Sequence, residues 1–367
     1  MRLFQIEVFR TSLRCHKPFQ TALVRSEICQ TIQVRLRTHN GLTGVGEAVP
    51  KPRLTGETLE GCEAALRDLL WPAIEGMDAR GVEDLHNAMS RVTVGHSSAR
   101  AALDVAIHDL LARAAGIPLH LFLGGTRRRV RTDFSIGLGT PAEAAAEARR
   151  QIEAGFQVIK LKVGLDPDED EERVRAVRAA IGPDLGLRVD ANEGWTFSEA
   201  LRALKRMEPC DLELVEQPLA RWDLEGMARL RGRVNVPLAA DEALQTPRDA
   251  LRIVESGAAD ILNLKLMKCG GIHLARQIAA VARSGGLGLM IGGMVGESRI
   301  SVTAAAALAA AWGFEYADLD ADLLLRDDPC PGAGLMLEGS ERVLAERPGL
   351  AIEQLSPEFC TPSPEEI

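Results

Sequence analysis

The sequence predicts an α/β protein: a (β/α)8-type TIM barrel with an N-terminal α+β capping domain that the C-terminal segment completes. Two observations predict the barrel. Residues 126–320 alternate short apolar segments with capped helical segments, and the number of apolar segments is eight. A third observation concerns the residues before and after the barrel. Residues 1–125 have the pattern of antiparallel strands followed by helices, whereas residues 321–367 are rich in Pro and Gly at first and too few to fold alone. We therefore expect three parts, with the last packed on the first.

The eight apolar segments have the length and composition of parallel strands that are buried on both faces. Helix start signals follow several of them: Thr140 with Glu143 and Thr196 with Glu199 have capping-box spacing, and Thr246 precedes a proline. Each connection is then expected to be a right-handed crossover. The segments are 132–137, 156–163, 185–192, 212–218, 236–242, 260–266, 287–293 and 314–320.

The first part of the chain alternates polar and apolar residues, which is typical of half-buried antiparallel strands. A turn at residues 39–41, His-Asn-Gly, separates two of these strands and indicates a hairpin. Helical patterns follow at 58–76, 81–92 and 98–115. The expected cap is therefore a sheet accompanied by helices.

Composition and charge exclude several classes of protein. Of the 367 residues, 46% are hydrophobic and 26% are charged, as in ordinary folded proteins. The net charge is −9, and we find no extended Lys/Arg-rich block or aromatic stripe of the kind that nucleic-acid surfaces use, so we expect no nucleic-acid partner. No apolar run approaches the ~18 residues of a membrane span. Seven scattered cysteines without a C-x-x-C pair, and an N-terminus unlike a signal peptide, favour the cytoplasm. A small molecule is the expected partner, and the oligomeric state stays open, a homo-oligomer included.

Acidic residues stand at the C-terminal ends of three consecutive predicted strands: Asp190, Glu216 and Asp241. They are 26 and 25 residues apart, about one strand and helix each, so they converge on one rim of the barrel, where such barrels carry their active sites. Three carboxylates at short range stay ionised only beside a cation. Oxygen ligands without a neighbouring Cys or His favour Mg²⁺ over zinc or iron.

Lysines flank these carboxylates on two other strands. In VIKLKVG (158–164), Lys160 and Lys162 share one face of the second strand, and Lys265 ends the sixth strand, across the barrel. An exposed strand is the usual setting for paired lysines, but helices on both sides argue against it here. A lysine acts as a base near neutral pH only when its pKa falls, and we expect Lys160 and the metal to lower the pKa of Lys162. Lys268 is expected at the surface.

Two bases on opposite sides of a metal-bound carboxylate favour one chemistry. One base removes the proton α to the carboxylate, the metal stabilises the enediolate, and the other base returns a proton from the far side, which inverts the carbon. Glu297, in the glycine-rich turn GGMVGES (292–298), is a further candidate for lining the site. His108 is expected to be a structural helix residue.

Five motifs stand at or near the predicted strand ends: KLK at 160–162, DAN at 190–192, EQP at 216–218, DE at 241–242 and NLKLMKCGG at 263–271. In combination they resemble the muconate lactonizing subgroup of the enolase superfamily, and the likeness covers essentially the whole chain. The mandelate racemase subgroup carries a histidine base on the seventh strand, where this sequence has none. The resemblance implies a set of Mg²⁺ ligands and an acid/base pair. The ligands are Asp190, Glu216 and Asp241, and the pair is Lys162 and Lys265, with Lys160 in support.

Asp318 and Asp320 stand two residues apart in the last predicted strand, so both face the rim. The segment DLDADLLL (318–325) resembles the Asp-x-Asp of the dipeptide epimerase branch, which binds the α-ammonium group of a dipeptide. The resemblance thus implies epimerisation of the C-terminal residue of a dipeptide. Side-chain preference is expected to be set by two loops of the cap that close over the barrel mouth, 15–27 and 49–56, where basic residues would suit an acidic side chain, as in the L-Ala-D/L-Glu epimerases. Arg25 is the main candidate, and the others are Lys17, Lys51 and Arg53.

Other functions stay open from the sequence. A racemase of N-acylated amino acids, a cycloisomerase or an o-succinylbenzoate synthase would use the same site without a free α-amino group. A Schiff-base lyase would use Lys162 or Lys265 as a nucleophile on a ketone and would need no metal. A barrel that only binds a ligand has no evident need for two opposed bases.

Overall fold

Eight parallel strands form a barrel in the middle of the chain, as the sequence predicted. The computed structural model describes residues 1–359 and 361–362. Neighbouring strands are hydrogen bonded in chain order from β5 to β12, and the first and last come together where the Asp133 N–H donates to Ala317 O at 3.2 Å. The strands are β5 (Phe134–Ile136), β6 (Val158–Lys162), β7 (Gly186–Asp190), β8 (Leu214–Glu216), β9 (Leu238–Ala240), β10 (Ile261–Leu264), β11 (Gly288–Gly292) and β12 (Tyr316–Asp318).

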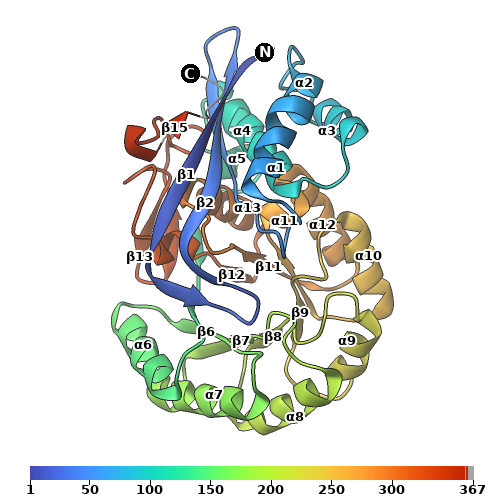
Figure 1. The fold of residues 1–367 in the computed structure, drawn as a ribbon, viewed down its shortest axis with the longest axis vertical. Coiled ribbons are helices and arrows are strands. Elements are labelled where there is room, and N and C mark those ends of the chain that lie inside the picture. The colour runs from blue at the N-terminus through green and yellow to red at the C-terminus, as the bar shows by residue number, and fades with distance from the viewer. Residues whose placement is uncertain (360, 363–367) are drawn as a thin grey trace.

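Helices follow the strands and cover the outside of the barrel (Figure 1). The predicted start signals are confirmed, because Thr140 and Thr196 form full capping boxes with the glutamates three residues on, and Thr246 forms one with Asp249. These boxes satisfy backbone groups that a helix end leaves unpaired, so they help to fix where each helix begins. The helices are α6 (Pro141–Glu153), α7 (Pro167–Ile181), α8 (Phe197–Met207), α9 (Leu224–Arg231), α10 (Pro247–Ser256), α11 (Leu266–Cys269), α12 (Ile272–Ser284) and α13 (Arg299–Trp312).

An antiparallel sheet and its own helices precede the barrel. In the sheet, β1 (Leu3–Gln20) pairs with β2 (Arg25–Thr38), and β2 pairs with β3 (Thr43–Ala48). Gly44 and Gly46 let a helix lie against β3, since a Cβ on either would come within 2.1 Å of a backbone oxygen of α4. The predicted helix 58–76 is continuous but contains one π-helical turn, η1. The helices are α1 (Leu59–Ala64), η1 (Ala65–Leu70), α2 (Trp71–Ile74), α3 (Val82–Val92), α4 (Ser97–Ala114) and α5 (Leu119–Phe122).

The hairpin of β1 and β2 reaches from this sheet to the barrel (Figure 1). Its turn is anchored there, because the N–H of Leu138, after β5, donates to Gln20 O at 2.9 Å. The register of the two strands shifts between Arg14 and Phe19, and within this bulge Cys15 bridges to Leu325 instead. The segment 15–27, expected as a loop, is therefore the turned end of a long hairpin.

The C-terminal segment contacts both the cap and the barrel. β13 (Leu335–Glu338) and β14 (Glu341–Leu344) form a sheet with β4 (Arg129–Arg131), just before the first barrel strand, and β15 (Thr361–Pro362) pairs with β1. The Leu350 N–H donates to Asp109 of α4 at 2.6 Å, and Asp327 pairs with Arg14 of β1 at 2.7 Å.

Three short 3₁₀ turns complete the described elements: η2 (Glu208–Cys210), η3 (Ala321–Leu324) and η4 (Pro357–Phe359). The division of the chain at 125 and 320 stays a prediction.

Apolar side chains form two large cores. One runs through the barrel and its helices, and the other lies between the sheet of the cap and helices α1 to α4. Among the helices of the described residues, none has the length and apolar character needed to cross a membrane.

Candidate active site

Asp190, Glu216 and Asp241 meet at one point of the barrel rim. Asp190 ends β7, Glu216 ends β8, and Asp241 directly follows β9. One carboxylate oxygen of each lies within 4.8 Å of the others, and all three side chains are buried. Burial and the adjacent negative charge of Asp190 raise the pKa of Glu216 to about 7. The group is therefore crowded enough to attract a cation.

Lys160 lies fully buried beneath this group. Its Nζ lies 3.1 Å from Asp190 Oδ2, 2.7 Å from Glu216 Oε2 and 2.6 Å from Asp318 Oδ2. Burial disfavours the ammonium form, but the carboxylates outweigh burial and hold the pKa of Lys160 well above its usual range. Lys160 is thus an internal counter-ion. Lys160 and Lys162 both contact Asp190 Oδ2.

Lys162 and Lys265 lie on opposite sides of the barrel, because β6 and β10 are four strands apart in a sheet of eight. Lys162 Nζ is 2.5 Å from Asp190 Oδ2, and Lys265 Nζ is 2.8 Å from Asp241 Oδ2. Burial opposes the charge of Lys265, but Asp241 and Glu216 outweigh burial and raise the pKa of Lys265. Both side chains line the same cavity.

Lys268 is buried, so its predicted place at the surface is wrong. Its ammonium group donates to the carboxylate and the backbone oxygen of Asp241, and to Asn263 O at 3.3 Å. The cause is α11, a single short turn that directs Lys268 back toward the strand ends. Asn263, which the sequence reasoning also missed, donates from Nδ2 to Glu216 Oε1 at 2.8 Å.

Amide side chains hold the loops of the rim in place. Gln217 Oε1 accepts from the N–H groups of Asp241 and Ala243 at 3.0 and 3.1 Å, and Asn192 Nδ2 donates to Glu242 Oε1 at 3.0 Å. Asn192 (φ 42°) and Gln217 (φ 35°) have left-handed backbone conformations, a strain that proteins keep mainly at functional sites. Burial and the Asp241 charge raise the pKa of Glu242 to about 8.

Asp318 and Asp320 lie side by side across Ser135 of β5. The Ser135 hydroxyl donates to Asp318 Oδ1 at 3.1 Å, and the Ser135 N–H donates to Asp320 Oδ2 at 2.6 Å. Both aspartates are buried and line the cavity. Burial and the Asp318 charge raise the pKa of Asp320 to about 7. The pair can therefore accept a cationic group from the cavity side.

A cavity of about 260 Å³ lies between the rim and the cap. Its floor is polar and includes Lys162, Asn192, Lys265, Asp318 and Asp320. Its cover combines five apolar side chains with four polar or charged ones at the hairpin turn and in the segment after β3. The cover consists of Phe19, Thr21, Leu23, Val24 and Ser26 from the hairpin, and of Lys51, Pro52, Arg53 and Leu54.

Two basic residues that the sequence proposed for the cover lie outside the cavity lining. Arg25 pairs with Glu27 at 3.0 Å with 60% of its side chain exposed, and Lys17 pairs with Glu147 at 3.2 Å with 69% exposed. Val24, next to Arg25, lines the cavity instead.

Glu297 is buried but is not part of the cavity lining. Its Oε1 accepts from the Met294 N–H at 2.8 Å and so closes the turn whose Gly293, Met294 and Val295 do line the cavity. Burial raises the pKa of Glu297 to about 8. Its contact with the cavity is therefore indirect. His108 lies in α4, where its Nδ1 is 2.8 Å from Asp104 O, far from the floor residues along the chain.

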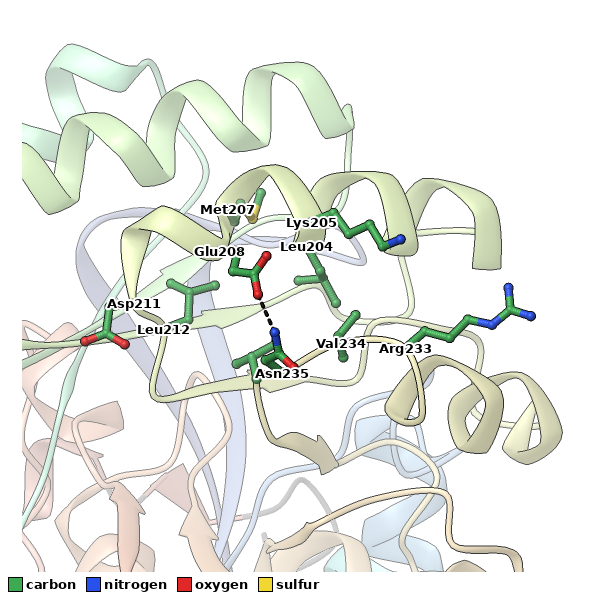
Figure 2. Close-up of a pocket in the computed structure, with 10 residues that line it drawn as sticks. Leu204, Lys205, Met207, Glu208, Asp211, Leu212, Arg233, Val234 and Asn235 are labelled. Atoms are coloured by element: carbon green, nitrogen blue, oxygen red, sulfur yellow. Dashed lines mark hydrogen bonds between the residues drawn. The ribbon is translucent and has the colours of Figure 1, made fainter.

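Figure 2 shows a different cleft, where Glu208 and Asn235 are hydrogen bonded. Its lining residues lie within 204–212 and 233–236, which are the segments that lead into β8 and β9. This cleft is therefore at the N-terminal face of the barrel, opposite the carboxylates. In such barrels that face serves stability and not catalysis.

The residues present fit a hard divalent cation. The donor atoms of Asp190, Glu216 and Asp241 are all carboxylate oxygens, they are buried, and no Cys or His is among them. This donor set suits Mg²⁺. Among the described residues, it is the one group of three acidic, His or Cys side chains with this spacing.

Comparison with known proteins gives a consistent result. Residues 4–124 match the model of the mandelate racemase / muconate lactonizing enzyme N-terminal domain, and residues 143–356 match the enolase C-terminal domain-like model. An L-Ala-D/L-Glu epimerase of Clostridium acetobutylicum is 38% identical over 97% of this chain and 100% of its own length. A hydrophobic dipeptide epimerase of Enterococcus faecalis is also 38% identical, over 96% of this chain and 99% of its own length.

A solved structure has the same architecture. The dipeptide epimerase of Enterococcus faecalis, in complex with Mg and the dipeptide L-Leu-L-Tyr, superposes with a TM-score of 0.94 at 38% identity. The match covers 96% of this chain and 100% of that one.

Proposed function

Because the chain belongs to the mandelate racemase / muconate lactonizing enzyme family of the enolase superfamily, we propose that it is a Mg²⁺-dependent dipeptide epimerase. It inverts the α-carbon of the C-terminal residue. The observation that carries this proposal is a single cavity lined both by the opposed lysines Lys162 and Lys265 and by the aspartates Asp318 and Asp320. Relatives with 38% identity over nearly the whole chain are dipeptide epimerases.

The two lysines move the proton. In the proposed reaction, one of them accepts the α-proton as a neutral amine, and the other donates a proton to the opposite face of the same carbon. Their places on β6 and after β10 put one on each side of the cavity. Asp190 contacts Lys162 and Asp241 contacts Lys265, so these two carboxylates hold the side chains of the pair in position.

Asp190, Glu216 and Asp241 would hold the metal ion. Bound Mg²⁺ supplies positive charge that stabilises the negative charge developing on the substrate carboxylate as the α-proton leaves. Lys160, clasped by two of these carboxylates and Asp318, keeps the ligands in place from below.

Asp318 and Asp320 would bind the α-ammonium group of the dipeptide. Ser135 holds both side chains by hydrogen bonds. Both line the cavity where β12 ends. A charge-assisted hydrogen bond contributes roughly 1.5 to 3 kcal/mol. An N-acylated amino acid carries no ammonium group and would bring no positive charge to these two buried carboxylates.

The side chain of the epimerised residue is a separate question. The sequence predicted an acidic one, and Lys51 and Arg53 of the cover could meet it. A second candidate is an apolar one, because Phe19, Leu23, Val24 and Leu54 line the cover, whereas Arg25 and Lys17 are paired outside it. The relatives include both an L-Ala-D/L-Glu and a hydrophobic dipeptide epimerase. We favour an apolar side chain, because apolar residues of the cover line the cavity.

One experiment tests the whole proposal. The protein is incubated with Mg²⁺ in D₂O with L,L-dipeptides whose C-terminal residues are acidic or apolar, and with N-acetylated versions of the same compounds. We expect a gain of one mass unit and inversion at the C-terminal residue for free dipeptides, and fastest for apolar ones. Exchange in the N-acetylated compounds alone would support a racemase of N-acylated amino acids instead. Absence of exchange throughout, with folded protein and bound Mg²⁺, would contradict both.

Two further proposals rest on the sequence. We propose the cytoplasm as the compartment, because the seven cysteines are scattered along the chain. We expect no nucleic-acid partner, because the net charge is −9. A homo-oligomer stays open.

A further inference from the structure

Two cysteines lie side by side under the cover of the cavity. Cys15 belongs to the bulge of β1 and Cys29 to β2, and their Sγ atoms are 4.0 Å apart. Both are free thiols. Cys29 is buried, with 1% of its surface exposed, whereas Cys15 is partly exposed. Within residues 1–359 this is the one contact between two thiol groups.

The surroundings favour a thiolate at the buried position. The hydrogen bond from Cys15 and the positive charge of Lys51 outweigh burial and lower the pKa of Cys29 to about 6. Gly296 makes this arrangement fit, since a Cβ there would lie 2.8 Å from Cys29 Cβ and 3.5 Å from Lys51 Nζ. A thiolate beside a thiol is the reactive form in disulfide exchange.

We propose that Cys15 and Cys29 form a site of reversible oxidation, which a low-molecular-weight disulfide converts into an intramolecular disulfide bond. The Cys29 thiolate accepts the Cys15 proton as Cys15 Sγ attacks the external disulfide, which forms a mixed disulfide on Cys15 and releases one thiolate. The proton on Cys29 then leaves to solvent or to the released thiolate. Cys29 attacks Cys15 Sγ, the protein disulfide forms and a second thiolate leaves. In total two protein thiols are oxidised and one disulfide is reduced to two thiols.

The bond requires a small movement of the bulge of β1. A disulfide needs an S–S distance of about 2.05 Å, so the two sulfur atoms must approach by roughly 2 Å. Cys15 lies where β1 leaves the register of β2, so the ladder between these strands does not hold its backbone, and its one bridge, to Leu325, is isolated. The remaining described cysteines, Cys62, Cys210, Cys269 and Cys330, are buried.

The site adjoins the cavity without belonging to its lining. Lys51 and Val295 line the cavity, and each also lies next to the pair: Lys51 through its charge, and Val295 through packing in the small apolar cluster around Cys29. Oxidation removes the thiolate beside Lys51 and ties the bulge of β1 to β2. We expect it to change the KM of a substrate more than its kcat, because the cover and not the floor is altered.

The test uses the full-length protein with Mg²⁺ and oxidised glutathione at neutral pH, followed by thiol titration and peptide mapping by mass spectrometry. We expect the loss of two thiols, a linked pair of peptides containing Cys15 and Cys29, and reversal by dithiothreitol. C29S should stop at a glutathione adduct on Cys15, and C15S should not react at residue 29, since Cys29 is buried. Lys51→Met should slow the reaction, while its matched control Arg53→Met should not.

These readouts do not depend on epimerase activity. Retention of both thiols by folded wild-type protein would overturn the proposal, as would a linkage to another cysteine or equal reaction of C15S and wild type. If the thiols react as expected but no dipeptide is epimerised, the proposed function fails and the oxidation site stands.

Discussion

The floor and the cover of the cavity are built differently. In the floor, buried charged side chains from five successive strands and the residues directly after them are paired with one another, as Lys160 is with three carboxylates. In the cap segments above it, Lys17 and Arg25 are exposed and paired away from the cavity, whereas side chains such as Phe19, which is 7% exposed, line the cavity. The difference indicates that the floor determines the reaction, whereas the cover determines which substrate is admitted.

The largest effect is expected in the floor. Lys162→Ala and Lys265→Ala should each abolish inversion, with a loss of about 10²- to 10⁴-fold, because each removes one of the two proton-transfer groups. Each variant should still exchange the α-proton of one enantiomer, since the remaining lysine can return a deuteron to the same face. Measuring exchange and inversion separately for both enantiomers checks this. Lys17→Ala, on the exposed side of the cover, is the control, and inversion by either floor variant at the wild-type rate would contradict the assignment.

Metal removal should separate activity from folding. EDTA should abolish exchange, but we expect the melting temperature to fall by only a few degrees, since Lys160 already neutralises part of the carboxylate charge. Lys160→Met should instead destabilise the protein by about 3 to 5 kcal/mol, because it leaves buried carboxylates unpaired. Calorimetry of both proteins with and without EDTA provides the measurement. Unfolding of the wild type by EDTA would show that the metal, and not Lys160, is the main counter-ion.

Asp320→Asn should weaken the binding of free dipeptides. The loss of one charge-assisted hydrogen bond predicts a KM higher by roughly 10- to 100-fold, with a smaller change in kcat. Any residual turnover of an N-acetylated substrate should change much less, because it has no ammonium group. Steady-state kinetics with matched pairs of compounds decide this. An equal loss for both members of a pair would mean that Asp320 has only a structural role.

Val24→Arg should shift the side-chain preference. A cation inside the cover should favour an acidic C-terminal residue over an apolar one. We expect the ratio of the two kcat/KM values to change by about tenfold, which corresponds to about 1.4 kcal/mol. Arg25→Ala should leave the preference unchanged, since Arg25 is paired with Glu27 outside the lining. Competition between acidic and apolar dipeptides measures both. A change caused by Arg25→Ala and not by Val24→Arg would reverse our placement of the cover residues.

The smallest effect concerns the junction of cap and barrel, where Asp104 of α4 accepts from the Ile272 N–H that begins α12. Burial disfavours the charged form of His108, but Asp104 outweighs burial and raises the pKa of His108 above its usual 6.5. Its stabilising effect should therefore be complete below pH 6.5 and disappear as the pH rises through the raised pKa. We expect His108→Gln to lower the free energy of unfolding more at pH 6 than at pH 9. Denaturant titrations at the two pH values test this, and equal losses would count against it.

The sequence predicted the floor better than the cover, for a physical reason. Strand alternation and the spacing of one strand plus one helix bring Asp190, Glu216 and Asp241 to one rim, and the structure places them there. The position of Lys268 was predicted wrongly, because a four-residue helical turn leaves no periodic signal. Which of Val24 and Arg25 faces inward depends on the exact turn of the hairpin. The alternation of side chains along a strand does not predict which residue faces inward near a shift of register.

The C-terminal segment has a consequence for how the protein unfolds. Its strands pair with β4 before the barrel and with β1 of the cap, and Leu350 is bonded to Asp109 in α4. Residues more than 200 positions apart thus hold each other in place. The cap cannot detach from the barrel without freeing this segment, so we expect cap and barrel to melt in one cooperative transition. Shortening the chain from its C-terminal end would then weaken both parts at once, rather than trim an appendage.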